Sequence, residues 1–247
     1  MNGDELAGRV AWVTGGASGM GAATVELLRA RRATVGVFDV KGLEGAPGDH
    51  NLLCDVADPV AVVRATEAMA SAIGPADILV SSAGIFEVHA LGKTSDEVWA
   101  RVIGVNLTGV FNMTRAVFTG MCDRGWGRIV SIASASAYRV GMGLTAYGAS
   151  KAGVVALMKG TALEGAAHGV TANSIAPGIV DTPMIRKYFP TDERMQRAAS
   201  DSPVANPQQA VIQPADVASA VVFLCLPESH RITGQTLHVN GGAITVS

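Results

Sequence analysis

The chain has 247 residues, of which 49% are hydrophobic and only 16% charged, and its formal net charge is −2. The length fits one large domain or two small ones, and so apolar a composition predicts extensive burial against partners. No basic block suggests nucleic acid, and the longest apolar stretch, 217–226, is about half of the roughly 20 residues that a membrane span needs. The acidic N-terminus lacks the apolar core of a secretory signal. We therefore expect a cytoplasmic homo-oligomer that binds neither membrane nor nucleic acid.

The three cysteines, Cys54, Cys122 and Cys225, lie far apart and without the spacing of a metal site. They are typical of buried free thiols in a reducing compartment, and a reactive thiol is the alternative interpretation. We expect no bound metal.

Short apolar runs alternate with longer Ala-rich segments along the chain. The runs predict strands buried on both faces, and the segments between them predict helices. This alternation is typical of a parallel sheet covered by helices on both sides. We therefore predict one α/β domain, 1–247, with a doubly wound Rossmann fold and about seven strands. The expected strands are 9–14, 33–39, 78–84, 128–134, 170–178 and 236–242, and the expected helices are 19–31, 58–73, 94–123, 147–167 and 214–226.

The segment 183–213 is the least regular part of the sequence, rich in Pro, charged and amide side chains. It lies between a predicted strand and a predicted helix, where a mobile lid over a substrate would be inserted. A plain surface loop is the alternative interpretation.

The first predicted strand runs directly into "TGGASGMG" (14–21), which opens a predicted helix. Gly15 permits a tight turn, Gly19 lets the backbone approach a pyrophosphate, and Gly21 lets the helix pack closely. The helix N-terminus then offers free N–H groups to the phosphates. This context predicts a dinucleotide site.

Asp39 ends the second predicted strand, about 20 residues after the glycine-rich turn. A carboxylate there accepts hydrogen bonds from ribose hydroxyls and repels a 2′-phosphate. Val40 and Ser18 offer no cation to such a phosphate. The sequence therefore favours NAD(H) over NADP(H).

Tyr147 and Lys151 lie four residues apart, so a helix would project both from one face. Alone, this pair is a weak signal.

Taken together, these features resemble the short-chain dehydrogenases/reductases of the non-extended type, from about residue 7 to the end. Any one of these motifs could occur by chance, but all of them in this order and spacing are specific to the family. They are "TGGASGMG" (14–21), Asp39, "CDVAD" (54–58), "SSAG" (81–84), "VNLTGVF" (105–111), "RIVSIAS" (128–134), "YGASK" (147–151), "NSIAPGIVDTPM" (173–184) and "ITGQTLHVNGG" (232–242).

The resemblance implies four catalytic residues. Tyr147 is similar to the family's acid/base, and Lys151 to the partner that lowers its pKa and holds the nicotinamide ribose. Because a free tyrosine has a pKa near 10, too high for an efficient base at neutral pH, we expect the lysine ammonium and an oxidised nicotinamide to lower the pKa of Tyr147. Ser134 is similar to the hydroxyl that orients the substrate, and Asn106 to the residue that supports a proton-relay water. The turn motif and the resemblance together imply that the cofactor is bound by Gly15, Ser18, Gly19, Met20, Gly21, Asp39, Asp55, Val56, Ser82, Ala83, Gly84, Tyr147, Lys151, Pro177, Gly178, Ile179 and Thr182.

Two positions depart from the family pattern. Ser82 stands where an Asn usually ties central strands together, and Arg32 stands where a helix-ending Gly is common. Both departures concern local stability rather than the reacting groups.

The substrate is described less clearly by the sequence. Family analogy places Ser134, Ser136, Leu144, Tyr147 and Met184 against it, together with Phe86, Ile179, Tyr188 and Phe189. Because most of these are apolar, we expect a secondary alcohol or its ketone. A reductase of 3-oxoacyl thioesters is the alternative, although that activity usually prefers NADPH, against which Asp39 argues. A non-catalytic NAD(H)-binding regulatory protein is the alternative from another class.

The resemblance also implies a homotetramer. The segments 94–123 and 147–167 would pair as helices across one interface, and the C-terminal strand would lie at another.

Overall fold

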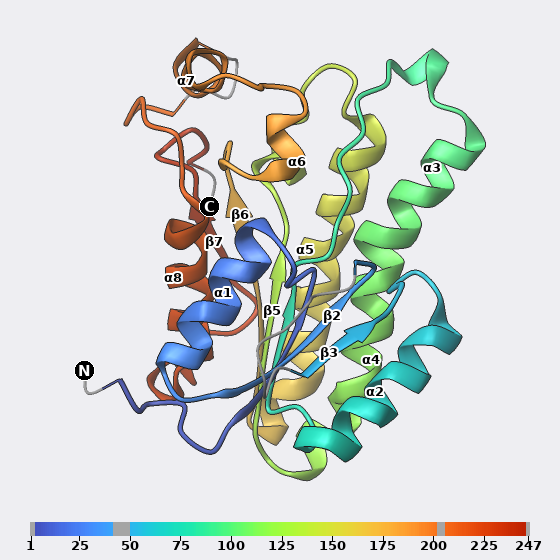
Figure 1. Ribbon diagram of the computed structural model, residues 1–247, viewed down its shortest axis with the longest axis vertical. Coiled ribbons are helices and arrows are strands. Elements are labelled where there is room, and N and C mark those ends of the chain that lie inside the picture. Colours follow the sequence, from blue (N-terminus) through green and yellow to red (C-terminus); the bar gives the residue numbers. More distant parts are fainter. Residues whose placement is uncertain (1–2, 42–49, 202–205, 246–247) are drawn as a thin grey trace.

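The computed structural model describes residues 3–41, 50–201 and 206–245. Seven strands form one parallel sheet in the order β3-β2-β1-β4-β5-β6-β7, with helices on both faces (Figure 1). This confirms the predicted doubly wound α/β fold. The strands are β1 (Val10–Thr14), β2 (Thr34–Asp39), β3 (His50–Leu53), β4 (Ile78–Ser81), β5 (Gly127–Ile132), β6 (Val170–Pro177) and β7 (Thr236–Val239).

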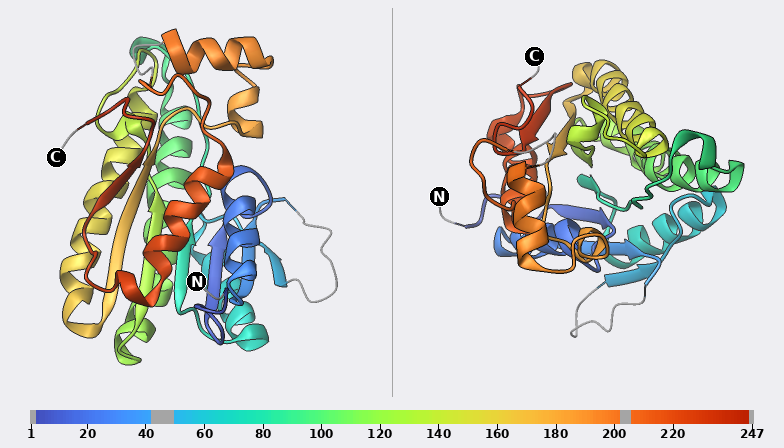
Figure 2. Two further views of the ribbon diagram at one scale, coloured as in Figure 1. Left: turned by 90° about the vertical axis from the view of Figure 1, so that its left-hand side faces the viewer. Right: turned by 90° about the horizontal axis from the view of Figure 1, so that it is seen from above.

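Helices α1 (Gly19–Ala30) and α8 (Pro214–Cys225) cover one face of the sheet, and α2 (Pro59–Ile73), α4 (Gly109–Asp123) and α5 (Thr145–Gly165) cover the other (Figure 2). Each face has its own apolar core, and the two cores are separated by the sheet. No helix among the described residues is long and apolar enough to cross a membrane.

The strands supply both cores because alternate side chains point to opposite faces. In β1, Val13 packs into the core under α1 and α8, while Trp12 packs into the core under α2 and α4. Its neighbour β2 repeats the pattern with Val37 and Phe38. The rings of Trp12 and Phe38 meet edge to face with centroids 5.5 Å apart. Burial on both faces explains why these strands read as unbroken apolar runs.

Two elements differ from the sequence-based expectation. Strand β3 was not predicted, because it has four residues at the sheet edge and its Leu53 is 69% exposed. The expected single helix 94–123 is α3 (Asp96–Ile103) and α4, joined by a π-helical turn at Gly104–Thr108. Such a turn widens a helix locally and is frequent at functional sites.

The strand order reverses between β1 and β4, and ligands of open α/β sheets bind above such a reversal. The ends of the two strands are joined there, because Thr14 Oγ1 accepts the N–H groups of Ser82 and Ala83 at 3.2 and 3.1 Å. The predicted lid, 183–213, forms α6 (Pro183–Arg186) and α7 (Asp192–Asp201) over this end of the sheet (Figures 1 and 2). Its residues 202–205 lie outside the described part, and its closing motion stays a prediction.

The predicted unusual turn at Arg32 is present. Arg32 has a φ of 66°, in the left-handed region that glycine tolerates better, and its guanidinium pairs with Asp4 at 2.7 Å.

Candidate active site

The glycine-rich turn is held against the loop that follows β4. Gly15 has a φ of 67°, and a Cβ there would lie 2.7 Å from the Cα of Ala83. A Cβ at Gly21 would lie 2.1 Å from the carbonyl oxygen of Gly15. The first turn of α1 therefore packs directly on the glycine-rich turn, which refines the expectation that Gly21 serves packing against the sheet.

The N-terminus of α1 opens at this turn. Ser18 precedes the helix in an extended conformation and its side chain does not cap the helix. The loop after β6 approaches from the opposite side, because a Cβ at Gly19 would lie 3.1 Å from Cγ2 of Thr182. The first-turn N–H groups and the positive end of the helix dipole thus border the space between the two loops, an arrangement suited to an anion.

Asp39 places a negative charge beside the same turn. Its carboxylate accepts the N–H of Ala17 at 3.1 Å and the N–H of Lys41 at 3.0 Å. The first bond links the end of β2 to the glycine-rich turn across 22 residues of chain. The next residue, Val40, is exposed and apolar, so it adds no positive charge beside the carboxylate.

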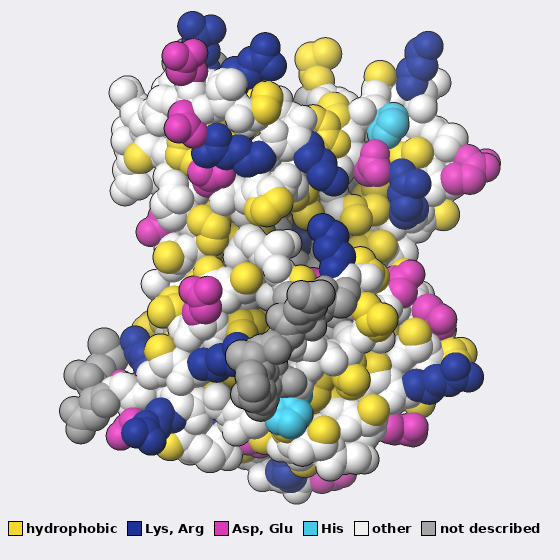
Figure 3. Space-filling model, in the orientation of Figure 1, with side chains coloured by type: hydrophobic (Ala, Val, Ile, Leu, Met, Phe, Trp, Pro, Cys, Tyr) yellow, Lys and Arg dark blue, Asp and Glu magenta, His cyan; other side chains and the backbone are white. Residues whose placement is uncertain are grey.

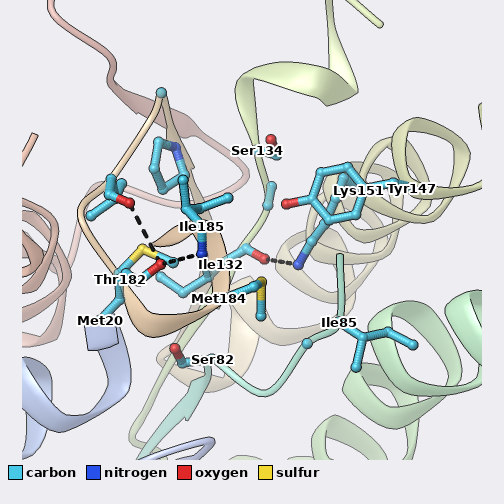
Figure 4. Close-up of a pocket in the computed structure, with 15 residues that line it drawn as sticks. Met20, Ser82, Ile85, Ile132, Ser134, Tyr147, Lys151, Thr182, Met184 and Ile185 are labelled. Atoms are coloured by element: carbon cyan, nitrogen blue, oxygen red, sulfur yellow. Dashed lines mark hydrogen bonds between the residues drawn. The ribbon is translucent and has the colours of Figure 1, made fainter. Parts of the chain in front are cut away.

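Ser134, Tyr147 and Lys151 come together from β5 and α5 (Figure 4). Ser134 follows the strand, and its Oγ accepts the N–H of Ser136 at 3.0 Å, which holds the hydroxyl oxygen in place. Lys151 is 5% exposed, donates from Nζ to the carbonyl oxygen of Ile132 at 2.8 Å, and lies 5.8 Å from the ring centroid of Tyr147.

Burial controls the protonation of these groups. It raises the pKa of the Tyr147 phenol above 10, an effect that a hydrogen bond with Ser134 partly offsets. It also lowers the pKa of the Lys151 ammonium to about 8. Burial is the larger of these two effects on the Tyr147 phenol, and the expected lowering of its pKa by the lysine and a nicotinamide charge together stays a prediction.

Asn106 lies in the π-helical turn and is fully buried. Its Oδ1 accepts the N–H of Ile85 at 2.8 Å, and its Nδ2 donates to the Ile85 carbonyl at 3.0 Å and to Ser150 Oγ at 3.1 Å. A Cβ at Gly84 would lie 3.2 Å from Asn106 Oδ1 and 3.6 Å from Lys151 Nζ, so both polar groups flank that glycine. The amide thus fixes the loop after β4 directly behind the lysine.

One pocket joins the two sides of the cleft (Figure 4). Ten residues predicted for cofactor or substrate line it: Met20, Ser82, Gly84, Ser134, Tyr147, Lys151, Pro177, Gly178, Thr182 and Met184. Five more were missed: Ile85, Ile132, Ala133, Val180 and Ile185. Each missed residue is apolar and stands next to a predicted one or one residue beyond it, so its only sequence signal was adjacency.

Other predicted residues lie outside this pocket. Leu144 precedes α5, Ser136 contacts Ser134, and Ile179 accepts the N–H of Ile212 through its carbonyl. Asp55 accepts the N–H of Ala57 at 2.9 Å in the loop after β3. The remaining predicted positions border the glycine-rich turn or its neighbouring loops: Gly15, Ser18, Gly19, Gly21, Asp39 and Ala83. Val56 lies against α4 instead, where its carbonyl oxygen accepts a hydrogen bond from Asn112 Nδ2 at 3.0 Å.

Charges of both signs are interspersed on the face shown in Figure 3. Near the pocket, Arg186 is occupied by Asp181 and Asp192 on its own segment. His89 and Arg101 both contact the carboxylate of Glu87, at 3.1 and 2.8 Å. The guanidinium groups of Arg186 and Arg101 are therefore already paired with carboxylates.

Comparison with known proteins agrees with this geometry. The family described as enoyl-(acyl carrier protein) reductase matches residues 15–244. Acetoacetyl-CoA reductase of Rhizobium meliloti is 40% identical over 240 residues, covering 95% of this chain and 98% of that protein. The 3-oxoacyl-[acyl-carrier-protein] reductase FabG of Vibrio harveyi is 39% identical over 249 residues, covering 98% and 100%.

A solved structure is also similar. The ligand-free aldohexose dehydrogenase of Thermoplasma acidophilum superposes with a TM-score of 0.89 at 29% identity, covering 99% of each chain. The sequence motifs, the seven-stranded parallel sheet and these relatives agree, and the chain belongs to the short-chain dehydrogenase/reductase family of oxidoreductases.

Proposed function

We propose that this protein is an NAD(H)-dependent oxidoreductase that interconverts a secondary alcohol and a ketone. The observation that carries the proposal is the convergence of Ser134, Tyr147 and Lys151 in one pocket with the glycine-rich side of the cleft. A regulatory protein without turnover would have no need of a buried lysine beside a half-buried phenol, since burying a charge is costly.

The residues present fit a nicotinamide dinucleotide. The uncapped N-terminus of α1 would hold the pyrophosphate, and Asp39 would accept the adenosine ribose hydroxyls. Lys151 would hold the nicotinamide ribose, and Thr182 with Gly178 would border the ring. The chemistry such a cofactor supplies is the transfer of a hydride.

Tyr147 and Ser134 would share the substrate oxygen. At neutral pH the raised pKa leaves the phenol protonated, so it can donate its proton to the oxygen of a ketone as that oxygen becomes negative. The Ser134 hydroxyl donates a second hydrogen bond to the same oxygen. In the reverse direction the phenolate oxygen accepts the proton of the alcohol. Lys151 is charged below about pH 8 and stabilises that phenolate. Asn106 would support a water that returns protons to the lysine.

The cofactor preference is tested by titrating NAD and NADP separately. Because the Asp39 carboxylate is fixed at the rim by the Ala17 N–H, we expect NAD to bind more tightly. In Asp39→Ser the difference should shrink. Tighter binding of NADP by the unmodified protein would contradict the preference for NAD.

A second candidate substrate is favoured by two relatives. Acetoacetyl-CoA reductase and 3-oxoacyl-[acyl-carrier-protein] reductase carry a 3-oxoacyl group in their names, and each matches this chain almost end to end. Such a thioester also contains a ketone, so the same four residues would serve. Reduction of acetoacetyl-CoA with either cofactor distinguishes this candidate from simple alcohols.

The decisive experiment is a screen for NADH formation over cyclic, aromatic, steroidal and hydroxy-acid alcohols, with acetoacetyl-CoA reduction alongside. Tyr147→Phe serves as the control, because it keeps the ring and removes the proton-transferring oxygen. Activity that disappears in this variant supports the proposal. Activity that survives it would show that Tyr147 is not the acid/base.

We also propose that the protein assembles as a homotetramer through α4, α5 and the strand β7. Phe111 on α4 and Leu163 on α5 are 41% and 83% exposed, and Leu237 on β7 is 38% exposed. Burying such side chains would provide apolar driving force for association. Sedimentation at micromolar concentration should give four chains, and a monomer would refute the assembly.

A further inference from the structure

Phe86 lies between two tyrosines that belong to different parts of the chain. Its ring meets that of Tyr147 edge to face, with centroids 4.9 Å apart and planes at 80°. On its other side it meets Tyr188 in the same manner, at 5.1 Å and 87°. Tyr147 comes from α5, Phe86 from the loop after β4, and Tyr188 from the segment after α6. Such edge-to-face pairs restrict the orientation of both rings.

The backbone of Phe86 is held from two directions. The Tyr188 hydroxyl donates to the Phe86 carbonyl oxygen at 3.0 Å, across 102 residues of chain. The preceding residue, Ile85, has both its N–H and its carbonyl bound by the buried amide of Asn106. Phe86 therefore sits on a rigid loop on the Asn106 side and is contacted by a surface residue on the other.

Tyr188 is part of the segment predicted as a lid. This segment is tied together by Arg186, which pairs with Asp181 and with Asp192 at the start of α7. Tyr188 is 38% exposed, and its ring contact and its hydrogen bond both go to Phe86. A displacement of the segment would thus remove a ring and a hydrogen bond from Phe86 together.

We propose that Phe86 is a positioning residue that sets the orientation of the Tyr147 ring, and that Tyr188 transmits the position of the 183–190 segment to it. In this arrangement the phenol is correctly placed only while the segment is seated. The consequence for catalysis rests on the proposed function, whereas the coupling between the three rings does not.

The groups that face Tyr147 are few. Lys151 lies on the same helix and Ser134 at the end of β5, while burial and, to a lesser extent, the nearby Glu87 carboxylate raise the pKa of the Tyr188 phenol. Because neither Phe86 nor Tyr188 carries a charge near neutral pH, replacing them changes the solvation and orientation of Tyr147 without changing its charged neighbours.

The coupling can be measured without substrate or cofactor. The chain has three tyrosines, Tyr138, Tyr147 and Tyr188, so ¹³Cζ-tyrosine labelling gives three NMR signals, assigned with single Tyr→Phe variants. The chemical shift and pH titration of the Tyr147 signal are then recorded in the intact protein, in Phe86→Leu, in Tyr188→Leu and in the double variant. Tyr138→Leu is the matched control, because the Tyr138 ring contacts His238 instead, with centroids 4.8 Å apart.

Phe86→Leu should admit water to the phenol and lower the pKa of Tyr147 by about half a unit, since burial is what raises it. Tyr188→Leu should move the Tyr147 signal in the same direction by less, and should add nothing once Phe86 is replaced. Tyr188→Phe, which retains the ring, should stay closer to the unmodified protein. Tyr138→Leu should leave the Tyr147 signal in place.

A Tyr147 signal that stays in place in both Phe86→Leu and Tyr188→Leu would overturn the proposal. Fully additive shifts in the double variant would also overturn it, because Tyr188 would then act without Phe86. Thermal melting of each variant confirms that it is folded, and Tyr188→Phe tests the coupling even where a leucine variant unfolds.

Turnover supplies a second readout. On an alcohol identified by the screen, Phe86→Leu should lower kcat about tenfold through misplacement of the phenol, with NAD affinity unchanged. A screen that finds no activity would refute the proposed function and leave the NMR coupling standing. NMR signals without coupling would refute the positioning role while leaving the function intact.

Discussion

The two sides of the cleft are built in different ways. The side formed by β1, α1 and β2 consists largely of backbone, because Gly15 and Gly21 leave no room for a Cβ and the helix N-terminus is uncapped. The side formed by β5 and α5 consists of side chains, with Ser134, Tyr147 and Lys151 converging from separate elements.

This difference shows two ways of making a site. A backbone site requires the absence of side chains at fixed positions, so its failures are steric and affect folding and binding together. A side-chain site requires particular functional groups held by tertiary contacts, so its failures are chemical and can leave the fold intact. Lys151 illustrates the cost of the second way, since its ammonium is buried and its pKa is lowered to about 8.

The largest expected effect follows from a change on the side of the cleft that is built from side chains. Ser134→Ala should lower kcat by about 10²–10³-fold, the usual result of losing one donor to a developing oxyanion. NAD affinity should be unchanged, because the hydroxyl serves the substrate oxygen. Steady-state kinetics and NAD titration measure the two quantities, and Ser134→Thr should restore part of the rate. If NAD affinity fell by as large a factor as kcat, Ser134 would serve the cofactor as well as the substrate, which would contradict the prediction.

The next largest effect is a loss of stability from a change on the side of the cleft that is built from backbone. Gly21→Ala should lower the free energy of unfolding by about 3 kcal/mol, because the new Cβ would lie 2.1 Å from the Gly15 carbonyl oxygen. Gly160→Ala is the control, since a Cβ there meets nothing within 4 Å beyond the adjoining backbone of its own helix, and it should raise stability by about 0.5–1 kcal/mol. Denaturant unfolding measures both, and equal effects at the two glycines would contradict the steric argument.

Lys151→Met should change stability and activity in opposite directions, as expected for a site that depends on a buried functional group. Because burial lowers the pKa of this lysine from 10.5 to about 8, the unfolded chain binds its proton more tightly than the folded chain. Removing the charge should therefore raise the free energy of unfolding by about 3 kcal/mol at pH 7, while turnover is lost.

The gain should persist below about pH 8 and disappear as the pH rises toward 10.5, since the folded lysine is then already neutral. Lys159→Met, an exposed lysine on the same helix, should leave stability nearly unchanged. Unfolding measured from pH 6 to 10 checks the slope, and a gain that grew with pH would contradict the sign.

The smallest expected effect comes from a residue outside both sides of the cleft. Arg32→Gly should raise the free energy of unfolding by about 0.5 kcal/mol, because glycine tolerates the φ of 66° and the exposed pair with Asp4 contributes little. Thermal melting measures the gain. A destabilised variant would mean that the pair outweighs the backbone strain.

Much of the fold could be predicted from periodicity. The unbroken apolar runs matched six of the seven strands, because strands buried on both faces have a strong signal. Strand β3 and the π-helical turn at Gly104–Thr108 could not be predicted, since the first is too short and the second depends on the buried contacts of Asn106.

The site was predicted unevenly. The glycine-rich turn and the family resemblance together identified ten residues of the pocket. Its apolar walls, such as Ile85 and Ile185, were missed because apolar side chains next to a motif look like any core residue. Burial raises the pKa of the Tyr147 phenol, an effect that the sequence could not show, because a sequence reveals neighbouring charges but not the loss of solvent.

The sequence by itself determined the sheet, the glycine-rich turn, Asp39 and the spacing of Tyr147 and Lys151, because these depend on local periodicity and on residue type. Only the tertiary structure decided how solvent is excluded from the phenol and the ammonium. It also decided that Phe86 stands between Tyr147 and Tyr188. Burial and ring contacts arise between segments that are far apart in the chain, and no local pattern encodes them.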